Sequence, residues 1–101
     1  MSVAVIGLSH RTSPVTVRER FAFADTEIPA VLAGLRATGL VDEAVILSTC
    51  NRVELYAAGP REAGALLAGL REFLLRDRQC DDTPESQLYT HAEGACVEHL
   101  F

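Results

Sequence analysis

Apolar residues along this 101-residue chain repeat with two different periods, and the order of those periods limits the folds that it can adopt. Four short runs have the β-branched content or the alternation that is typical of strands: residues 3–8, 44–47, 53–57 and 87–90. Two longer stretches repeat at helical spacing, with faces formed by Ile28, Val31, Leu32 and Leu35 and by Ala63, Leu66, Leu67, Leu70 and Leu74. The order β-α-β-β-α-β predicts an α+β fold of the ferredoxin-like, split βαβ kind, with an antiparallel sheet and helices on one face.

Residues at the ends of the helical stretches predict where helices begin and stop. Ser13-Pro14 is expected to cap and open a short helix over residues 15–22, because serine caps well and proline suits the first helical position. The long helix is expected to open at Gly59-Pro60 and to fray near Arg78, before a loop at 80–84.

Two further helix boundaries follow from the same reasoning. One helix is expected to start at residues 25–26 and to stop at Gly39. Thr90 and Glu93 have the spacing of a capping box, which predicts a trailing helix through residues 96–100. The chain ends without a stop signal in that helix, so the sequence is expected to be a piece of a longer protein.

Length and charge exclude several classes of function. A chain of 101 residues is one domain, too short to add a dinucleotide-binding domain, and it contains no GxGxxG motif. Its net charge is -5, with nine arginines and no lysine. This argues against a general nucleic-acid binder, because such affinity comes from neutralised phosphates. Contact with RNA would have to be local, through arginines such as Arg11, Arg18 and Arg20.

The cysteines bear on compartment and on metal binding. Cys50, Cys80 and Cys96 lack CxxC spacing, so neither a disulfide framework nor a zinc site is expected, and the protein is predicted to be cytoplasmic. The N-terminus lacks a basic region ahead of its short apolar run, which favours a strand over a signal peptide. No apolar run is long enough to span a membrane.

Cys50 differs from the other two cysteines in its placement. It lies in the polar connection 48–51 between two strand-like runs, which together predict a hairpin with the thiol exposed and held at its bend. A cation such as Arg52 would favour the reactive thiolate, and free N–H groups of the turn would stabilise an oxyanion beside the sulfur. The alternative is that Cys50 is only a small residue in a turn, as packing alone explains Cys80 and Cys96.

Three blocks of the sequence resemble the signatures of one enzyme family. Residues 48–54, STCNRVE, resemble the STCNRxE signature of glutamyl-tRNA reductases. Residues 7–15, GLSHRTSPV, followed by Arg18-Glu19, are similar to that family's GxxHxxxPVxxRE opening. Residues 95–101, ACVEHLF, are similar to the segment that carries its HLF triplet. The blocks follow the family's order along nearly the whole chain, which therefore resembles the family's N-terminal catalytic domain.

The resemblance implies a reaction on glutamyl-tRNA. The Cys50 thiolate would attack the aminoacyl ester, release the tRNA and hold glutamate as a thioester. NADPH would then supply a hydride, giving glutamate-1-semialdehyde, the precursor of 5-aminolevulinate and tetrapyrroles. A thioester accepts hydride more readily than an ester, so the sulfur divides one difficult step into two easier ones.

The resemblance also implies roles for residues around Cys50. Arg52 is expected to bind the side-chain carboxylate of glutamate, the one carboxylate left free when the α-carboxyl is esterified, and so to exclude glutaminyl-tRNA. The alternative is that Arg52 is only a solvated arginine of the turn. Thr49 and Asn51 are expected to orient substrate by hydrogen bonds, although ordinary turn chemistry explains them nearly as well. His99 is expected to be a catalytic acid–base group, with a packed helix residue as the alternative.

Other polar residues receive weaker assignments. His10 is expected to make a structural hydrogen bond or to form a wall of the site, and His91 is expected at the surface. Glu19 and Glu54 are expected to belong to the framework, where either could form an ion pair with an arginine such as Arg18 or Arg52. A pairing of Glu54 with Arg52 ranks below a purely structural role, because it would compete with substrate for the guanidinium.

The resemblance further implies parts that this chain lacks. The family's enzymes carry an NADPH-binding domain and a helical dimerisation domain in a V-shaped homodimer, so no cofactor is expected to bind this chain alone and the complete reaction is not expected from it. The competing hypothesis is a non-catalytic ferredoxin-like module that binds a ligand or partner, since such folds host many functions. A nucleic-acid-binding domain is disfavoured by the charge and by the few aromatic residues.

Overall fold

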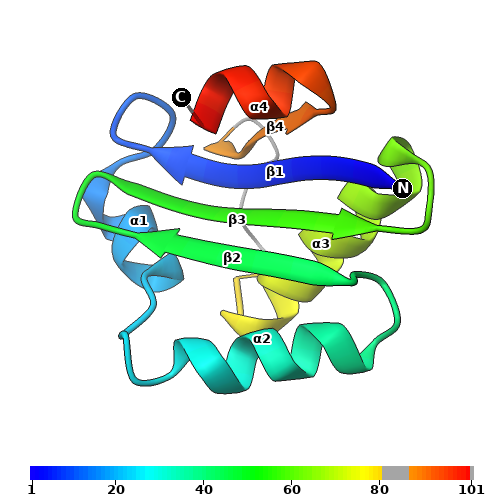
Figure 1. Ribbon diagram of the computed structural model, residues 1–101. Coiled ribbons are helices and arrows are strands. Elements are labelled where there is room, and N and C mark those ends of the chain that lie inside the picture. Colours follow the sequence, from blue (N-terminus) through cyan, green and yellow to red (C-terminus); the bar gives the residue numbers. More distant parts are fainter. Residues whose placement is uncertain (81–86, 101) are drawn as a thin grey trace.

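A four-stranded antiparallel sheet forms the centre of the computed structural model, which describes residues 1–80 and 87–100 (Figure 1). Its strands are β1 (Ser2–Ser9), β2 (Glu43–Ser48), β3 (Arg52–Gly59) and β4 (Tyr89–Ala92). They lie in the order β2-β3-β1-β4, and each neighbouring pair is antiparallel. This is the strand order of the ferredoxin-like, split βαβ arrangement, so the predicted α+β fold is confirmed.

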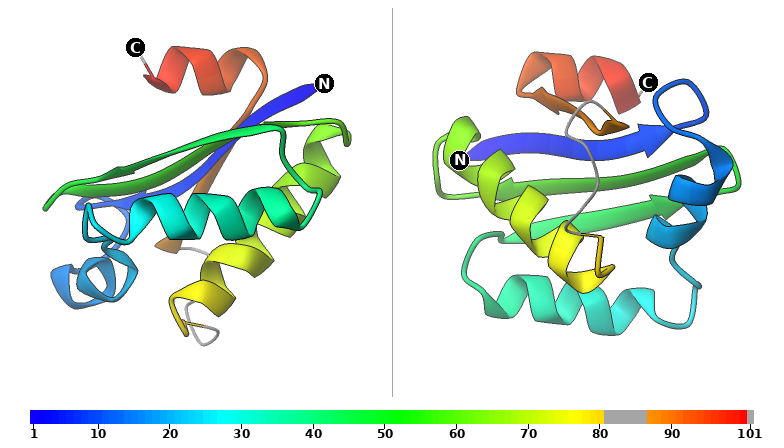
Figure 2. Two further views of the ribbon diagram at one scale, coloured as in Figure 1. Left: turned by 60° about the horizontal axis from the view of Figure 1, so that its bottom comes forward. Right: turned by 180° about the vertical axis from the view of Figure 1, so that it is seen from behind.

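Helices cover both faces of the sheet, but unequally. Figure 2 shows α1 (Val15–Phe21), α2 (Ile28–Ala37) and α3 (Ala63–Asp77) on one side and α4 (Gly94–Leu100) on the other. The main core lies between the sheet and the first three helices, where the fully or almost fully buried residues include Ala4, Ile6, Leu8, Val53, Leu55, Leu66, Leu70 and Leu74. The trailing helix α4 therefore covers part of the opposite face of the sheet.

Strand β1 is central in the sheet and buried on both faces. Val5 is fully buried on the α4 side, just as its neighbours Ala4 and Ile6 are fully buried on the core side. This explains why residues 3–8 form a continuous apolar run, since a strand covered on both faces has no polar side. Strand β2, at the sheet edge, instead alternates between partly buried and exposed residues.

Two predicted N-terminal helix caps are wrong, for local reasons. Ser13 does not cap α1, because its hydroxyl donates to the carbonyl of Ser9 at 3.3 Å and Pro14 occupies the N-cap position. Helix α3 begins at Ala63 and not at Gly59-Pro60, because Gly59 still pairs with Ser2 in the sheet. Glu62 caps it, with side-chain oxygens 2.6 and 3.1 Å from the N–H groups of Ala65 and Gly64.

The last strand and helix lie a few residues later than predicted. Strand β4 begins at Tyr89, so Thr90 belongs to the sheet and cannot cap a helix. Glu93 has a positive φ of 56°, and its N–H donates to the carbonyl of Val3 at 2.8 Å, which ties the start of α4 to β1. The predicted capping box is therefore wrong. The predicted loop at 80–84 lies, apart from Cys80, outside the described residues.

The predicted end of the second helix is confirmed, although its start is not. Gly39 follows α2 with a φ of 77°, a conformation that glycine adopts without strain, and its N–H donates to the carbonyl of Arg36 at 3.1 Å. The helix begins at Ile28, after Glu27 at the N-cap, two or three residues later than the predicted start at 25–26. The connection from Gly39 then brings the chain back to the edge strand β2.

Candidate active site

The β2–β3 turn carries Cys50 on an ordered, exposed bend. The N–H of Thr49 donates to the carbonyl of Arg52 at 2.8 Å, which closes the hairpin. The hydroxyl oxygen of Thr49 accepts from the N–H groups of Asn51 and Arg52 at 3.3 and 3.2 Å. Cys50 is exposed at the tip, whereas Cys80 and Cys96 are buried. The hairpin prediction is confirmed, and the thiol is open to solvent.

The hydrogen bonds of the turn limit which backbone groups can serve an oxyanion. The N–H groups of Thr49, Asn51 and Arg52 each donate to an acceptor inside the turn. Among the described residues, the N–H of Cys50 has no protein acceptor. The expected set of free N–H groups is thus reduced to one. The Thr49 hydroxyl organises the bend itself, as the alternative interpretation of that residue anticipated.

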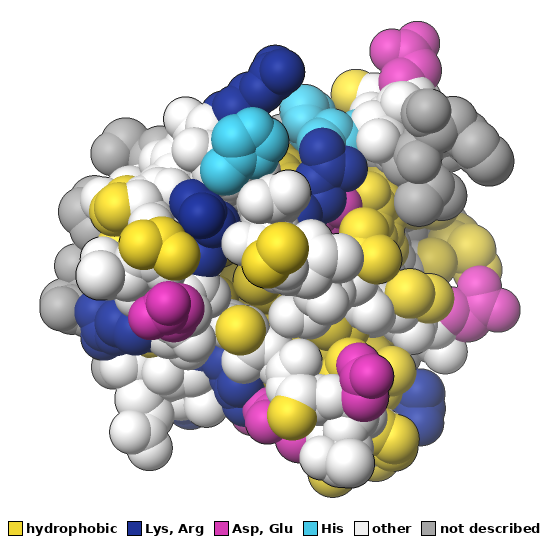
Figure 3. Space-filling model, turned by 90° about the vertical axis from the view of Figure 1, so that its left-hand side faces the viewer, with side chains coloured by type: hydrophobic (Ala, Val, Ile, Leu, Met, Phe, Trp, Pro, Cys, Tyr) yellow, Lys and Arg dark blue, Asp and Glu magenta, His cyan; other side chains and the backbone are white. Residues whose placement is uncertain are grey.

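The loop after β1 packs against the same turn. The N–H of His10 donates to the carbonyl of Asn51 at 2.9 Å, while the His10 side chain is exposed. Arg18, in α1, donates from Nη1 to the carbonyl of Ser13 at 2.7 Å and from Nε to the carbonyl of Cys50 at 3.4 Å. Figure 3, which views this end of the molecule, shows arginine and histidine side chains gathered on it.

Arg52 pairs with Glu54, which the sequence analysis ranked as the less favoured arrangement. Nη1 of Arg52 lies 3.8 Å from Oε1 of Glu54. The arginine side chain is 44% exposed, whereas that of Glu54 is fully buried. Because alternate residues of a strand share a face, the two side chains leave β3 on the same side of the sheet. The arrangement that ranked second is therefore the one observed.

Glu54 is the centre of a buried polar cluster on the α4 side of the sheet. The Tyr56 hydroxyl donates to Oε1 at 3.1 Å, the Tyr89 hydroxyl donates to Oε2 at 2.5 Å, and Nε2 of His99 contacts Oε2 as well. We call Glu54, Tyr56, Tyr89 and His99 the Glu54 cluster. A buried carboxylate is tolerated only when such donors replace the water that it has lost.

Gly7 makes space for this cluster. It lies opposite Glu54 in the β1–β3 pairing and opposite Tyr89 in the β1–β4 pairing. A Cβ at this position would come within 2.6 Å of the carbonyl oxygen of Val53 and 2.9 Å of Cγ of Glu54. The missing side chain thus lets the groups from β3 and β4 meet across the central strand.

The electrostatics of the cluster keep Glu54 ionised. Burial alone would raise the pKa of Glu54, but hydrogen bonds from Tyr89, His99 and Tyr56 and the charge of His99 outweigh it, so the pKa lies below 4.5. Burial, together with the charge of Glu54 and the hydrogen bond to it, raises the pKa of Tyr56 to about 12. Burial and the same carboxylate raise the pKa of Tyr89 as well. At neutral pH the tyrosines are therefore donors and Glu54 the acceptor.

The ring of His99 is held between the carboxylate and a neighbouring histidine. The centroids of His91 and His99 are 4.6 Å apart with an angle of 31° between the rings, and the Tyr89 ring lies 5.2 Å from that of His99. His91, which was expected at the surface, is partly exposed there and packs against this stack. His99, from α4, is thereby fixed against the sheet.

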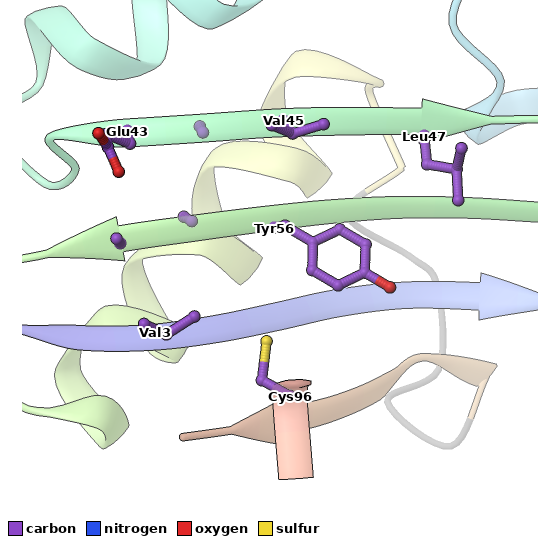
Figure 4. Close-up of a pocket in the computed structure, with 9 residues that line it drawn as sticks. Val3, Glu43, Val45, Leu47, Tyr56 and Cys96 are labelled. Atoms are coloured by element: carbon purple, nitrogen blue, oxygen red, sulfur yellow. The ribbon is translucent and has the colours of Figure 1, made fainter. Parts of the chain in front are cut away.

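An apolar groove of about 420 Å³ lies beside the Glu54 cluster, on the same face of the sheet. Figure 4 shows its lining, with Cys96 projecting from α4 and Tyr56 from β3. Burial and the charges of Glu54 and Glu93 raise the pKa of Cys96. This thiol therefore stays protonated at neutral pH, which agrees with the absence of a role for it in the sequence analysis.

The structure brings together most of the residues that the sequence singled out. Thr49, Cys50, Asn51 and Arg52 share one turn, and His99 is connected to Arg52 through Glu54, without a recorded contact to Cys50. The sequence analysis missed the contact of Arg18 with Cys50, the space at Gly7 and the donors Tyr56 and Tyr89. One signal was available, because glutamate and tyrosine alternate with core residues in 53–57 and so share a face.

Two kinds of feature are absent from the described part of the chain. No group of three or more histidine, cysteine, aspartate or glutamate side chains within residues 1–80 and 87–100 is arranged to hold a metal ion. Over the same residues, no helix has the length and apolarity needed to cross a membrane.

Comparison with known proteins gives consistent matches along the chain. Residues 6–101 match the family model described as "Glutamyl-tRNAGlu reductase, N-terminal domain". All of the chain aligns with glutamyl-tRNA reductases of Stenotrophomonas maltophilia strain K279a, at 46% identity, and of Herpetosiphon aurantiacus, at 42%. It spans only 22% and 24% of their respective lengths.

A solved structure has the same fold. The glutamyl-tRNA reductase from Methanopyrus kandleri superposes with a TM-score of 0.65 over 97% of this chain and 21% of that chain, at 24% sequence identity. At this level of identity the likeness concerns the fold, and it agrees with the antiparallel sheet described above.

Proposed function

The chain belongs to the family of glutamyl-tRNA reductase N-terminal domains, and we propose that it is the catalytic domain that takes glutamate from tRNA within a longer enzyme. The observation that carries this proposal is the exposed Cys50 thiol on an ordered turn, with Arg52 beside it and His99 connected through Glu54. The longer enzyme would be an oxidoreductase of tetrapyrrole biosynthesis.

The first step is an acyl transfer to sulfur. The Cys50 thiolate attacks the carbonyl carbon of the aminoacyl ester, a C–S bond forms, and the ester C–O bond breaks. The terminal ribose of the tRNA leaves as a hydroxyl after it takes up a proton. The Cys50 N–H, which has no acceptor within the turn, is placed to stabilise the negative charge on the carbonyl oxygen.

Arg52 selects the glutamyl side chain. Its guanidinium is partly exposed and lies 3.8 Å from Glu54, a distance too long for a strong hydrogen bond. Glu54 keeps three other donors, Tyr56, Tyr89 and His99, so it does not depend on Arg52. Arg52 is therefore able to turn to a substrate carboxylate, which its planar fork binds bidentately.

His99 exchanges a proton with the reacting groups. Nε2 of His99 contacts the Glu54 carboxylate, which orients the ring in the way that a buried carboxylate orients a catalytic histidine. Among the described residues no hydrogen bond to the other ring nitrogen, Nδ1, is seen, and on this proposal Nδ1 faces the substrate. On this proposal the Glu54 cluster places the acid–base group, and Cys50 forms the covalent bond.

NADPH does not fit the residues of this chain. Dinucleotides bind at the carboxyl ends of parallel strands beside a glycine-rich turn, whereas this sheet is antiparallel throughout and the sequence has no GxGxxG. On this proposal no residue of the chain holds the cofactor. NADPH binding and homodimerisation are proposed for parts of the longer enzyme, and the cytoplasm remains the predicted compartment.

The decisive experiment is intact-protein mass spectrometry after incubation with glutamyl-tRNA. We expect a glutamyl adduct that maps to Cys50 and that hydroxylamine removes, as a thioester requires. Cys50→Ser is the negative control, and Cys96→Ser, in which a buried thiol is lost, is the matched control that keeps the adduct. No adduct on the wild-type protein would favour the competing hypothesis of a non-catalytic binding module.

A further inference from the structure

We propose that Arg18 is a positioning residue for Cys50, which it holds by bridging the start of α1 to the β2–β3 turn. This inference rests on the proposed role of Cys50 as nucleophile. The sequence alone offered Arg18 as part of the opening motif, as one of several arginines for contact with RNA, and as an ion-pair partner for Glu19 or Glu54.

The Arg18 guanidinium donates to two carbonyl groups that are far apart in the chain, those of Ser13 and Cys50, at 2.7 and 3.4 Å. The contact to Cys50 spans 32 residues, and it reaches the backbone of the proposed nucleophile itself. A planar guanidinium presents several N–H groups in a fixed fork, which suits a bridge between two acceptors.

The Arg18 bridge acts together with a second long-range contact to the β2–β3 turn. The N–H of His10, in the loop that follows β1, donates to the carbonyl of Asn51 at 2.9 Å. This loop and helix α1 are therefore both attached to residues 50 and 51. The bonds within the turn, made by Thr49, fix its internal shape but not its orientation relative to the rest of the molecule. Orientation of an attacking atom matters for acyl transfer, where a small misplacement lowers the rate strongly.

Among the described residues no carboxylate pairs with Arg18, whereas Arg52 lies near Glu54 and Arg78 pairs with Glu27 and Asp77. The partners of Arg18 are backbone carbonyls. Its role is therefore one of geometry, and a lysine, with its single terminal nitrogen, would not reproduce the two-point bridge.

The test compares Arg18→Gln and Arg18→Lys with Arg36→Gln. Arg36 is a suitable control because it is exposed in the last turn of α2 and has no side-chain partner in the described part of the chain. Circular dichroism establishes that each variant folds. Native-state hydrogen exchange then reports on the N–H groups of His10 and Thr49, which lie at the two sides of the bend.

We expect both Arg18 variants to speed exchange at His10 and Thr49 by about two- to tenfold, as loss of one hydrogen bond implies, without change at the centre of β1. Single-turnover acylation of Cys50 at saturating glutamyl-tRNA is expected to fall about tenfold or more. Arg36→Gln should leave both quantities at the wild-type values.

Three results would overturn the inference. One is wild-type acylation and exchange in Arg18→Gln, and another is full rescue by Arg18→Lys. The third is a higher half-saturating concentration of tRNA, together with a weaker salt dependence of tRNA binding and an unchanged rate at saturation. That result would mean that Arg18 contacts a phosphate of the tRNA. If the wild-type protein itself forms no adduct, the proposed function fails first.

Discussion

Gly7 lies directly opposite Glu54 in the β1–β3 pairing, and a side chain at Gly7 would occupy space that Glu54 now fills. The same glycine is opposite Tyr89 in β4, whose hydroxyl donates to the Glu54 carboxylate. A residue that carries no chemistry thus determines whether a buried carboxylate can gather donors from its own strand β3, from β4 and from α4.

Replacement of Gly7 by alanine should destabilise the fold. The added Cβ would lie 2.6 Å from the carbonyl oxygen of Val53, a backbone atom that cannot move aside without disturbing the sheet. We expect the free energy of unfolding to fall by about 1–3 kcal/mol, as overpacking of a core does. Urea denaturation measures this value.

Gly34→Ala is the matched control for that experiment. Gly34 lies in α2, and a Cβ there meets no atom within 4 Å. This substitution should stabilise the protein by about 0.5–1 kcal/mol, because alanine favours helix over glycine. Equal changes in the free energy of unfolding for the two substitutions would show that a Cβ at Gly7 is not crowded by its neighbours.

Stability should decrease in acid in a manner that Glu54 controls. The pKa of Glu54 is lowered: burial, which raises it, is outweighed by donors from Tyr89, His99 and Tyr56. A carboxyl with a lowered pKa in the folded state contributes stability above its unfolded value, about 4.5, and loses it as pH falls through the folded value. The free energy of unfolding should therefore fall in this window.

Glu54→Gln tests this assignment. The variant should be less stable at neutral pH by about 1.5–3 kcal/mol, since hydrogen bonds to a charged group are lost, and its stability should depend less on pH below 4.5. Glu98→Gln, on the exposed side of α4, is the control and should follow the wild-type curve. An acid dependence that is unchanged in Glu54→Gln would assign it to other carboxylates.

The strand order and the position of Cys50 were predictable from local patterns. Alternation in 53–57 and the apolar run 44–47 placed a hairpin around residues 48–51, and hairpins form between neighbours in sequence. Resemblance of the surrounding residues to a known motif then separated Cys50 from Cys80 and Cys96.

The Glu54 cluster was not predictable in the same way. Its members come from β3, β4 and α4, and His99 is 45 residues from Glu54. The alternation of β3 showed that Glu54 points away from the main core, but not that α4 covers it there. The start of α4 is set by the Glu93 N–H contact with Val3, a tertiary hydrogen bond that outweighs the local capping pattern of Thr90 and Glu93.

The cysteines should differ widely in reactivity toward iodoacetamide in the native protein. Cys50 is exposed, whereas Cys80 and Cys96 are buried and Cys96 has a raised pKa from burial and from the charges of Glu54 and Glu93. We expect Cys50 to be modified at least about tenfold faster at neutral pH, because it is accessible to the reagent whereas burial hinders both access and thiolate formation at Cys96. Peptide mapping over time measures the three rates, with urea-unfolded protein as the control in which they converge. Comparable native rates would contradict the placement of Cys50 on an open turn.

Arg52 should decide between glutamyl- and glutaminyl-tRNA. The two substrates differ by a charge at the end of the side chain, and a site built to bind a carboxylate rejects the uncharged amide because the guanidinium would lose its partner. Arg52→Gln is expected to lower the ratio of adduct formation between the two tRNAs by about tenfold or more. Arg52→Lys should recover part of this preference, since it keeps the charge but not the bidentate fork.

The buried cluster makes this experiment interpretable. Glu54 retains donors from Tyr56, Tyr89 and His99 when Arg52 is replaced, so the fold and the placement of His99 should persist, which thermal unfolding checks. Arg11→Gln removes the same charge from the adjoining loop and should keep the wild-type preference. If Arg52→Gln forms adducts with the wild-type ratio, the carboxylate is recognised elsewhere. Arg52 would then serve only as the partly exposed partner of Glu54, the arrangement that the sequence alone had ranked second.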